Sequence, residues 1–235
     1  MSFSFLLTSD HHHKESTPGN PRRNPVTLCA DPLASDDFVI FAGDATDKGR
    51  AYEINEFQTE FVDVVEGMGR RVNCVPGNHD YFTKWYEQII PCKKGSPAMK
   101  YFENRGELKP YFFDHKNVRF ISLGMYPTSS ARLFLRNRME GYFGPVVLFW
   151  HYNLEGAWSE GDEEHPFTKT DKDELWLLLS SFGTQIKGIL CGHHHVSAKS
   201  FWKHWPVYQA AGDHHIARLI YHPDRKDLFV DYITF

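Results

Sequence analysis

Residues 71–80 read RVNCVPGNHD, and this stretch decides the expected fold. An apolar run of strand length, Arg71 to Val75, is followed by Pro76-Gly77 and then by Asn78, His79 and Asp80. A short apolar run that ends in a proline–glycine turn is typical of a buried strand. The sequence therefore predicts a strand whose carboxyl end presents three polar side chains.

Four further apolar runs share this arrangement. They are Phe3 to Thr8, Phe38 to Ala42, Val146 to Trp150 and Ile186 to Cys191. The polar residues that follow them are Asp10-His11-His12-His13, Gly43-Asp44-Ala45-Thr46-Asp47, His151 and Gly192-His193-His194-His195. Ligands of open α/β sheets bind beyond the carboxyl ends of the strands, so five neighbouring strand ends would bring these groups together. Glycines in three of the turns would let the backbone bend sharply there.

Helix-like stretches lie between these runs, and a second group of strand-like segments follows. The expected helices are Tyr52 to Glu66, Thr83 to Ile89 and Asp171 to Phe182, the last capped by Thr170 or Asp171. The further strands are Lys100 to Glu103, Pro110 to Asp114, Val118 to Leu123, Val207 to Ala211, Ile216 to Tyr221 and Leu228 to Ile233. Glu15 to Pro32 and Asn153 to Lys169 are expected to be surface loops. This alternation predicts a layered α/β fold, with residues 1–235 forming a single domain.

Composition excludes several classes of protein. The chain has 235 residues, 41% of them apolar, which is enough for a substantial core. A net charge of -4 argues against a dedicated polyanion binder. No apolar run reaches the roughly 18 residues that span a bilayer, and residues 1–10 lack the features of a signal peptide. The four cysteines form no CxxC pair, which predicts a reducing compartment, and we expect a cytoplasmic protein.

The polar residues at the strand ends predict a metal site. The expected ligands are carboxylate, imidazole and amide groups without a thiolate: Asp10, His12, Asp44, Asn78, His151, His193 and His195. Such donors suit Mn, Fe, Zn, Ni or Co, with manganese favoured. Seven groups are too many for one tetrahedral ion, so the set predicts two divalent ions that share a carboxylate.

The ordered motifs D-x-H, GDxxD, GNHD, H and GHxH resemble those of the calcineurin-like metallophosphoesterases. The resemblance extends from Asp10 to His195 and implies a four-layer α/β/β/α sandwich with two mixed β-sheets. It also implies the roles of the ligands. Asp10, His12 and His195 would bind one ion, Asn78, His151 and His193 would bind the other, and Asp44 would bridge them.

The resemblance further implies catalytic roles for two residues. His79 resembles the residue that protonates the leaving oxygen or stabilises charge on the phosphate, and Asp80 would orient its ring. The nucleophile would be a hydroxide that bridges the two ions.

Differences between these motifs and those of individual branches of the family narrow the expected substrate class. GDATDKG and GNHD differ from the GDxVDRG and GNHE of protein serine/threonine phosphatases, and the arginines of that branch have no clear match. The pattern is similar to single-domain cyclic-nucleotide phosphodiesterases. We therefore expect a metal-dependent hydrolase of small phosphodiesters, with a phosphomonoesterase or nuclease of the same superfamily as the alternative. A non-catalytic scaffold on this fold is a hypothesis from another class.

Other residues near the motifs are given structural roles or none. His115, His165, His204 and His222 are expected to lie in turns, and His11 and His194 to point away from the ions. Asp213, His214 and His215 are a further candidate for the rim of the site. The acidic loop of Glu155, Glu160, Asp162, Glu163 and Glu164 would repel long nucleic acids, so the expected partner is a small phosphoester.

Overall fold

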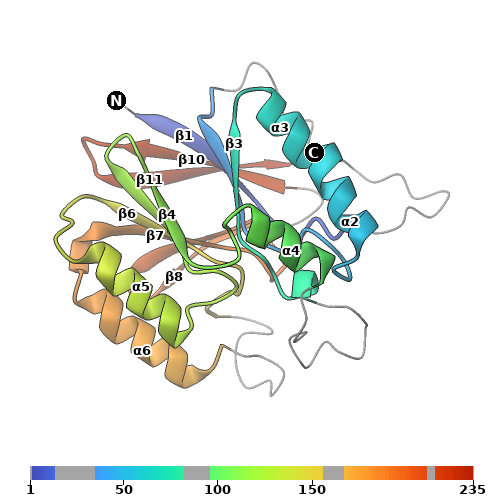
Figure 1. Cartoon of the computed structure of the whole chain (residues 1–235). Coiled ribbons are helices and arrows are strands. Elements are labelled where there is room, and N and C mark those ends of the chain that lie inside the picture. Colours follow the sequence, from blue (N-terminus) through green and yellow to red (C-terminus); the bar gives the residue numbers. More distant parts are fainter. Residues whose placement is uncertain (1, 14–34, 82–95, 156–166, 211–214, 235) are drawn as a thin grey trace.

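The computed structural model describes residues 2–13, 35–81, 96–155, 167–210 and 215–234. Two β-sheets pack against each other, and helices cover the outer face of each sheet (Figure 1). This arrangement confirms the four-layer α/β/β/α sandwich with two mixed sheets.

The first sheet has five strands in the order β11-β10-β1-β2-β3. Their bounds are Phe3–Thr8 for β1, Phe38–Phe41 for β2, Arg71–Cys74 for β3, His215–His222 for β10 and Asp227–Thr234 for β11. β1, β2 and β3 run parallel, while β10 pairs antiparallel with both β1 and β11. The carboxyl ends of the three parallel strands therefore lie at one edge of this sheet.

The second sheet has six strands in the order β4-β5-β6-β7-β9-β8. Their bounds are Tyr111–His115 for β4, Val118–Ser122 for β5, Val146–Phe149 for β6, Ile186–Cys191 for β7, Ala198–Trp202 for β8 and Trp205–Gln209 for β9. β5, β6, β7 and β9 run parallel, and the two edge strands are antiparallel to their neighbours. Both sheets therefore contain a parallel core with antiparallel strands at the side.

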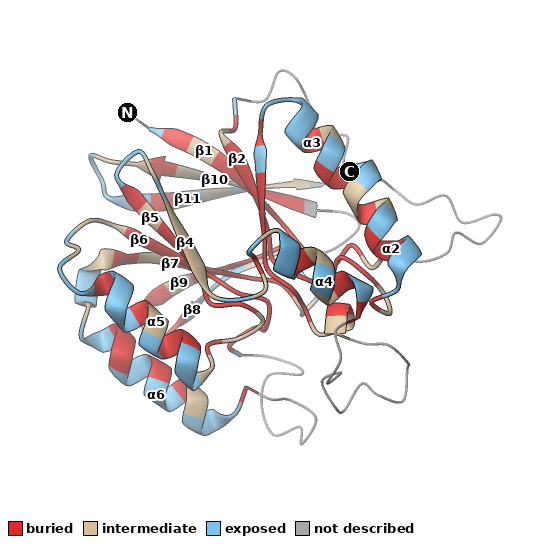
Figure 2. Ribbon diagram, in the orientation of Figure 1, coloured by how far each residue is buried: buried red, intermediate tan, exposed pale blue. Residues whose placement is uncertain are grey.

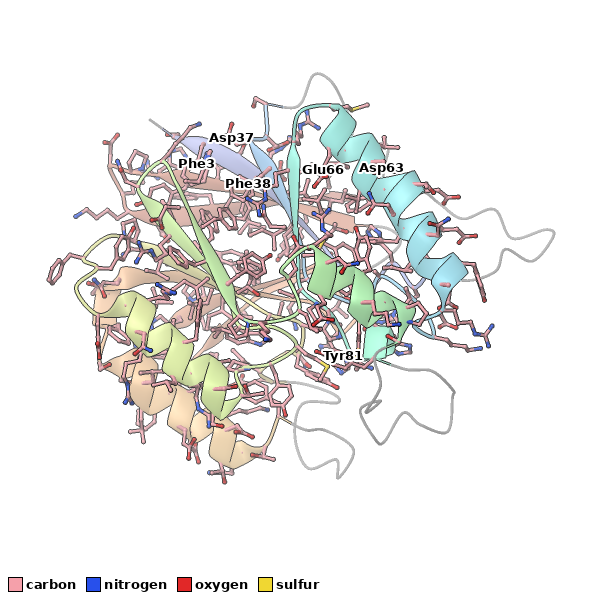
Figure 3. The ribbon with its side chains drawn as sticks, in the orientation of Figure 1. Phe3, Asp37, Phe38, Asp63, Glu66 and Tyr81 are labelled. Atoms are coloured by element: carbon pink, nitrogen blue, oxygen red, sulfur yellow. The ribbon has the colours of Figure 1, made fainter. Side chains whose placement is uncertain are left out.

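Aromatic residues fill the layer between the sheets. Phe5 of the first sheet meets Phe120 of the second edge to face, with ring centroids 5.2 Å apart. Phe3 and Phe38 extend this cluster toward the amino ends of the strands (Figure 3). Leu6, one residue from Phe5, belongs to the cluster on the opposite face of the same sheet. The alternation is the period of a strand whose two faces are both buried.

The two outer layers are helical and bury one face each (Figure 2). α2 (Ala51–Glu56), the π-helical segment η1 (Phe57–Val62), α3 (Asp63–Gly67) and α4 (Pro97–Asn104) cover the first sheet. α5 (Ser129–Met139) and α6 (Lys169–Ser180) cover the second. Two short 3₁₀ helices, η2 (His79–Tyr81) and η4 (Gly183–Gln185), complete the described helices.

Some sequence expectations are wrong in detail. Lys100 to Glu103 is helical rather than extended, because Ser96 caps α4 by accepting a hydrogen bond from the amide of Met99 and Pro97 follows it. α6 begins after Thr168, which caps it in place of Thr170 or Asp171. α5 and β8 were not expected at all. The expected helix Thr83 to Ile89 and the loop Glu15 to Pro32 lie outside the described residues.

Among the described residues, no helix combines the length and the hydropathy that crossing a bilayer requires.

Candidate metal centre

The predicted ligands follow three strands of the first sheet and two strands of the second. The loops after β1, β2 and β3 supply Asp10, His12, Asp44 and Asn78, and the loops after β6 and β7 supply His151, His193 and His195. Because the carboxyl ends of all five strands lie at the same side of the sandwich, the loops meet across the layer between the sheets. The site is therefore built at the junction of two halves of the fold.

Four donor atoms converge around Asn78. Its Oδ1 lies 2.9 Å from His151 Nε2 and 3.0 Å from His193 Nδ1. The two imidazole nitrogens are 3.2 Å apart, and His151 Nε2 lies 3.3 Å from Asp44 Oδ2. Ligands bound about 2.1 Å from one ion lie about 3.0–3.4 Å from each other, so these separations fit a single transition-metal ion.

A second group lies on the other side of Asp44. His195 Nε2 is 3.0 Å from His12 Nε2 and 3.5 Å from Asp10 Oδ1. His12 Nε2 is also 3.8 Å from the same Asp44 Oδ2 that faces His151. One carboxylate oxygen thus stands between the two groups, which is the placement that a shared ligand requires. Asp10–His12–His195 and Asp44–His151–His193 each have the proximity of donors to one ion.

The backbone at these residues is strained. Asp10, His12 and Asp44 have φ angles of 56°, 45° and 57°, and His193 and His195 have 70° and 51°. This left-handed region costs a non-glycine residue about 1–2 kcal/mol. The other described non-glycine residues with positive φ are confined to hairpin turns: Lys116, Asn117, Lys203 and Lys226. Strain that is otherwise limited to hairpins is therefore concentrated at the predicted ligands, as at other functional sites.

Glycines make room for the ligands. A Cβ added at Gly43 would lie 2.5 Å from His151 Nδ1, and one added at Gly192 would lie 2.7 Å from Asp10 Oδ2. At Gly77 it would lie 2.7 Å from Cγ of Asp44. Each contact is shorter than a real Cβ tolerates, so a side chain at any of the three positions would displace a predicted ligand.

A model of the calcineurin-like phosphoesterase family matches residues 3–197 of the chain. The chain belongs to the calcineurin-like phosphoesterases. A comparison with curated proteins gives no match.

Solved structures share the fold of this phosphoesterase at low sequence identity. A dimetal phosphatase from Danio rerio superposes with a TM-score of 0.62 at 12% identity, covering 99% of each chain. The phosphopantetheinyl hydrolase of Mycobacterium tuberculosis gives a TM-score of 0.55 at 16% identity, over 89% of this chain and 90% of that one. A protein proposed to be a 5′-nucleotidase from Staphylococcus aureus gives 0.59 at 13% identity. That match covers 100% of this chain but 54% of the other, so the phosphoesterase spans about half of that structure. These similarities establish the fold.

Hydrogen bonds to the protein backbone fix two imidazoles of the phosphoesterase. His151 Nδ1 donates to the carbonyl oxygen of Ala42 at 2.8 Å, which leaves Nε2 facing Asn78 and Asp44. His79 Nδ1 donates to the carbonyl oxygen of Asp47, also at 2.8 Å. Carbonyl partners of this kind select the tautomer and orient the ring.

Burial and neighbouring charges shift the pKa values of the titratable groups in the site in different directions. Burial lowers the pKa of His12 to about 4 and raises that of Asp10 to about 6. Burial opposes the charge on Asp44, but the neighbouring imidazoles of His151 and His79 hold its pKa below the ordinary value. Burial also opposes protonation of His151, yet the Asp44 carboxylate raises its pKa to about 9. Asp44 and His151 thus form a buried ion pair, and a cation bound there would displace the proton of His151.

The role expected for Asp80 is corrected by its contacts. Its carboxylate accepts hydrogen bonds from the amides of Gly77, Ala45 and Thr46, at 2.9, 3.3 and 3.0 Å, and from the Thr46 hydroxyl at 2.8 Å. His79 Nδ1 is instead held by the Asp47 carbonyl. Asp80 therefore joins the loop after β2 to the loop after β3 and positions Asp44 relative to Asn78.

The remaining histidines and the rim are only partly described. His11 is buried beside Phe41 and Phe61, away from the cluster as expected, and its Nε2 lies 3.0 Å from the Thr8 hydroxyl. His115 pairs with Asp37 instead of with the site. The sequence analysis missed Ser9, whose hydroxyl contacts the Asp10 carboxylate, and its position directly before Asp10 was the available signal. His165, Asp213, His214, the side chain of His215 and most of the acidic loop lie outside the described residues.

Proposed function

We propose that this chain hydrolyses small phosphodiesters, such as cyclic nucleotides, with two divalent metal ions, manganese being favoured. The observation that supports this most strongly is the placement of Asp44 Oδ2 between two groups of donors. Bound ions would lower the pKa of water so that a hydroxide is available near neutral pH, and they would neutralise the phosphate.

The ligand assignment follows the two groups. Asp10, His12 and His195 hold one ion in this proposal, and Asn78, His151 and His193 hold the other. Asp44 is shared. The donor set contains no thiolate and supports Mn, Fe, Zn, Ni or Co rather than a soft-metal site.

His79 is the proposed proton donor to the leaving oxygen. Burial opposes its protonation, but the charge of Asp44 and the hydrogen bond to the Asp47 carbonyl raise its pKa above the ordinary value. A raised pKa favours the protonated imidazole, which is the form that donates. Its ring contacts that of His12 edge to face, with centroids 4.5 Å apart, so the donor stands beside the proposed metal pair.

The preference for diesters over monoesters rests on the motifs. GNHD with His79 is similar to cyclic-nucleotide phosphodiesterases, and the arginines that protein phosphatases place around a monoester find no clear match in this sequence. Activity on monoesters is a compatible secondary property, because a two-metal site grips the phosphate rather than the leaving group.

Turnover of bis(p-nitrophenyl) phosphate with added manganese tests this function. We expect hydrolysis by the wild type that stops in EDTA. Asp44→Asn should lose both metal and turnover, whereas His79→Ala should retain metal and lose roughly 10²–10⁴-fold in kcat. His222→Ala, in which the histidine lies far from the cluster against Phe229, is the matched control and should behave as wild type.

The same assay defines the substrate class. A panel of cyclic nucleotides, linear dinucleotides and monoesters should show higher kcat/KM for the diesters. Absence of turnover in protein that analysis shows to contain two manganese ions would contradict the proposal.

A further inference from the structure

Three tyrosines from separate segments lie close together, and one of them contacts His193. Tyr81 ends η2 after β3 and lies next to α4 (Figure 3), Tyr126 follows β5, and Tyr152 follows β6. The ring of Tyr152 contacts that of His193, with centroids 4.5 Å apart, and Tyr126 contacts Tyr152 at 5.9 Å. Phe167 lies against Tyr126 at 5.7 Å. A continuous aromatic surface, here called the aromatic wall (Tyr126, Tyr152 and Phe167), therefore leads away from a proposed metal ligand.

The residues of the aromatic wall differ in exposure. Tyr152 and Phe167 are buried, whereas Tyr126 and Tyr81 are partly exposed. The amides of His151 and Tyr152 both donate to the Met125 carbonyl, at 3.1 and 3.0 Å, which ties the Tyr126 loop to the site. Tyr126 thus offers a ring that is held in place by its neighbours and is partly exposed.

Tyr126 of the wall and the nearby Tyr81 each carry a hydroxyl group. Within the described ranges, neither the Tyr81 nor the Tyr126 hydroxyl makes a hydrogen bond in the structure. Burial, and then the neighbouring Asp80 and Tyr126, raise the pKa of Tyr81 to about 12, so its hydroxyl remains a donor at neutral pH. A tyrosine with an accessible face and a free hydroxyl can both stack on a ring and bond to its polar edge.

The side of the cluster away from the aromatic wall carries charged and titratable groups. There, His12 and His79 adjoin Asp47, with His12 Nδ1 4.0 Å from Asp47 Oδ1, and Lys48 lies 3.8 Å from the other oxygen of that carboxylate. A phosphoester at the cluster would therefore meet charged groups on one side and aromatic rings on the other. A flat apolar substituent is suited to the aromatic side.

We propose that Tyr126, supported by Tyr152 and Phe167, binds a planar aromatic substituent of the phosphoester, as a nucleobase or an aryl ester presents. The inference rests on the proposed function and specifies which esters that site prefers. Stacking on an aromatic side chain tolerates many rings because each presents a π-face, so the wall selects for an aromatic group over an aliphatic one.

Paired inhibitors that differ only in the ring test the wall. The pairs are AMP with ribose 5-phosphate, for a nucleobase, and phenyl phosphate with methyl phosphate, for an aryl group. Inhibition constants are measured against bis(p-nitrophenyl) phosphate hydrolysis by the manganese-loaded full chain. Tyr126→Leu should weaken AMP or phenyl phosphate by about fivefold or more and leave the ring-free partner unchanged.

Two matched variants isolate the ring. Tyr126→Phe keeps the stacking face and should retain the discrimination between the members of each pair. Phe143→Leu removes an aromatic residue that is 90% exposed and lies just before β6, at the amino end of the strand, and should change nothing. An effect on AMP alone identifies a nucleobase site, and an effect on phenyl phosphate identifies a general aryl site.

Equal losses for both members of each pair, or no loss in Tyr126→Leu, would overturn the inference. If the wild type does not hydrolyse the diester, the proposed function fails on its own. Calorimetric titration of the manganese-loaded protein with AMP and ribose 5-phosphate then decides the wall separately: tighter binding of AMP that Tyr126→Leu abolishes supports it, and equal binding rejects it.

Discussion

Individual residues at this site are held in conformations that the other described non-glycine residues adopt only in hairpin turns. His12 has a φ of 45°, and the residues on either side of it are buried. The surrounding structure must stabilise this geometry, because the left-handed region is unfavourable for any residue with a Cβ. The strained backbone lets Asp10 and His12, two residues apart in the same loop, direct their side chains to the same point.

The strain at His12 predicts an unusual order of stabilities. Both His12→Gly and His12→Ala remove the imidazole, but only glycine relieves the backbone. We expect metal-free His12→Gly to be more stable than His12→Ala by about 0.5–1 kcal/mol in urea unfolding. At the exposed helical position Lys100 the order should reverse, with the glycine variant about 1 kcal/mol less stable. Equal stabilities of the two His12 variants would show that the φ angle carries no strain.

Protons at single residues predict how metal binding depends on pH. In the metal-free protein burial disfavours a charged His151, but the Asp44 carboxylate raises its pKa to about 9, and burial raises that of Asp10 to about 6. A ligand must be deprotonated to bind, so metal displaces these protons. Manganese affinity should therefore rise as the pH increases from 6 to 9. Calorimetry in buffers of different ionisation enthalpy should detect proton release below pH 9, and a pH-independent affinity would contradict the coupling.

At the scale of elements, the loops after β2 and β3 are joined by one carboxylate. Asp80 is fully buried and accepts from four donors in the two loops. Asparagine has the same shape but offers only one accepting oxygen, and its amide NH2 group would face groups that are themselves donors. The relative position of Asp44 and Asn78 therefore depends on the charge of a residue that touches neither ion in the proposed site.

Asp80→Asn should therefore destabilise the fold and weaken metal binding together. We expect a loss of about 1–3 kcal/mol in unfolding free energy, because a buried donor would lose its partner. Manganese titration should show a weaker site even where the variant is fully folded. Asp224→Asn, at an exposed turn, is the control and should change neither quantity. An Asp80→Asn variant with wild-type metal affinity would remove the positioning role.

The sequence predicted the elements whose pattern is strong and missed those whose pattern is weak. The five buried strands before the motifs were found within a residue of their ends, because buried strands read as continuous apolar runs. α5 was missed because its exposed arginines hide the spacing of Ala131, Leu135 and Met139, which all pack on the second sheet. β8 is a largely exposed edge strand with no alternation to recognise.

The candidate site was predictable in its residues but not in its connections. Motif order named the donors that the structure brings together. The motifs could not show which donors belong to which sheet, because the local sequence pattern does not determine the order of strands in a sheet. The sequence also named the wrong partner for the His79 ring. The ring is held by the backbone carbonyl of Asp47, and a backbone contact cannot be predicted from residue type.

For the whole molecule, each proposed ion would be bound by both halves of the sandwich. Asp10 and His12 face His195 across the layer between the sheets, and Asn78 faces His151 and His193. Bound metal would therefore cross-link the two sheets at one end, in addition to the aromatic core that joins them along their length.

Metal should accordingly stabilise the entire fold. Tm should rise with manganese concentration, and at about one hundred times Kd each site should add about 2.7 kcal/mol. Thermal unfolding monitored across a manganese titration measures this, with Asp44→Asn as the variant in which the shift should nearly vanish. A wild-type Tm that does not change with manganese concentration would argue against ions that join the sheets.

The five left-handed residues also have an evolutionary consequence. While hydrolysis is under selection, their side chains cannot be exchanged for the residue that the backbone prefers. In a lineage released from that selection, glycine becomes the stabilising replacement at positions 10, 12, 44, 193 and 195, whereas the buried strands remain constrained by packing. Loss of activity would therefore appear first as glycines at these loop positions in a chain whose core is intact.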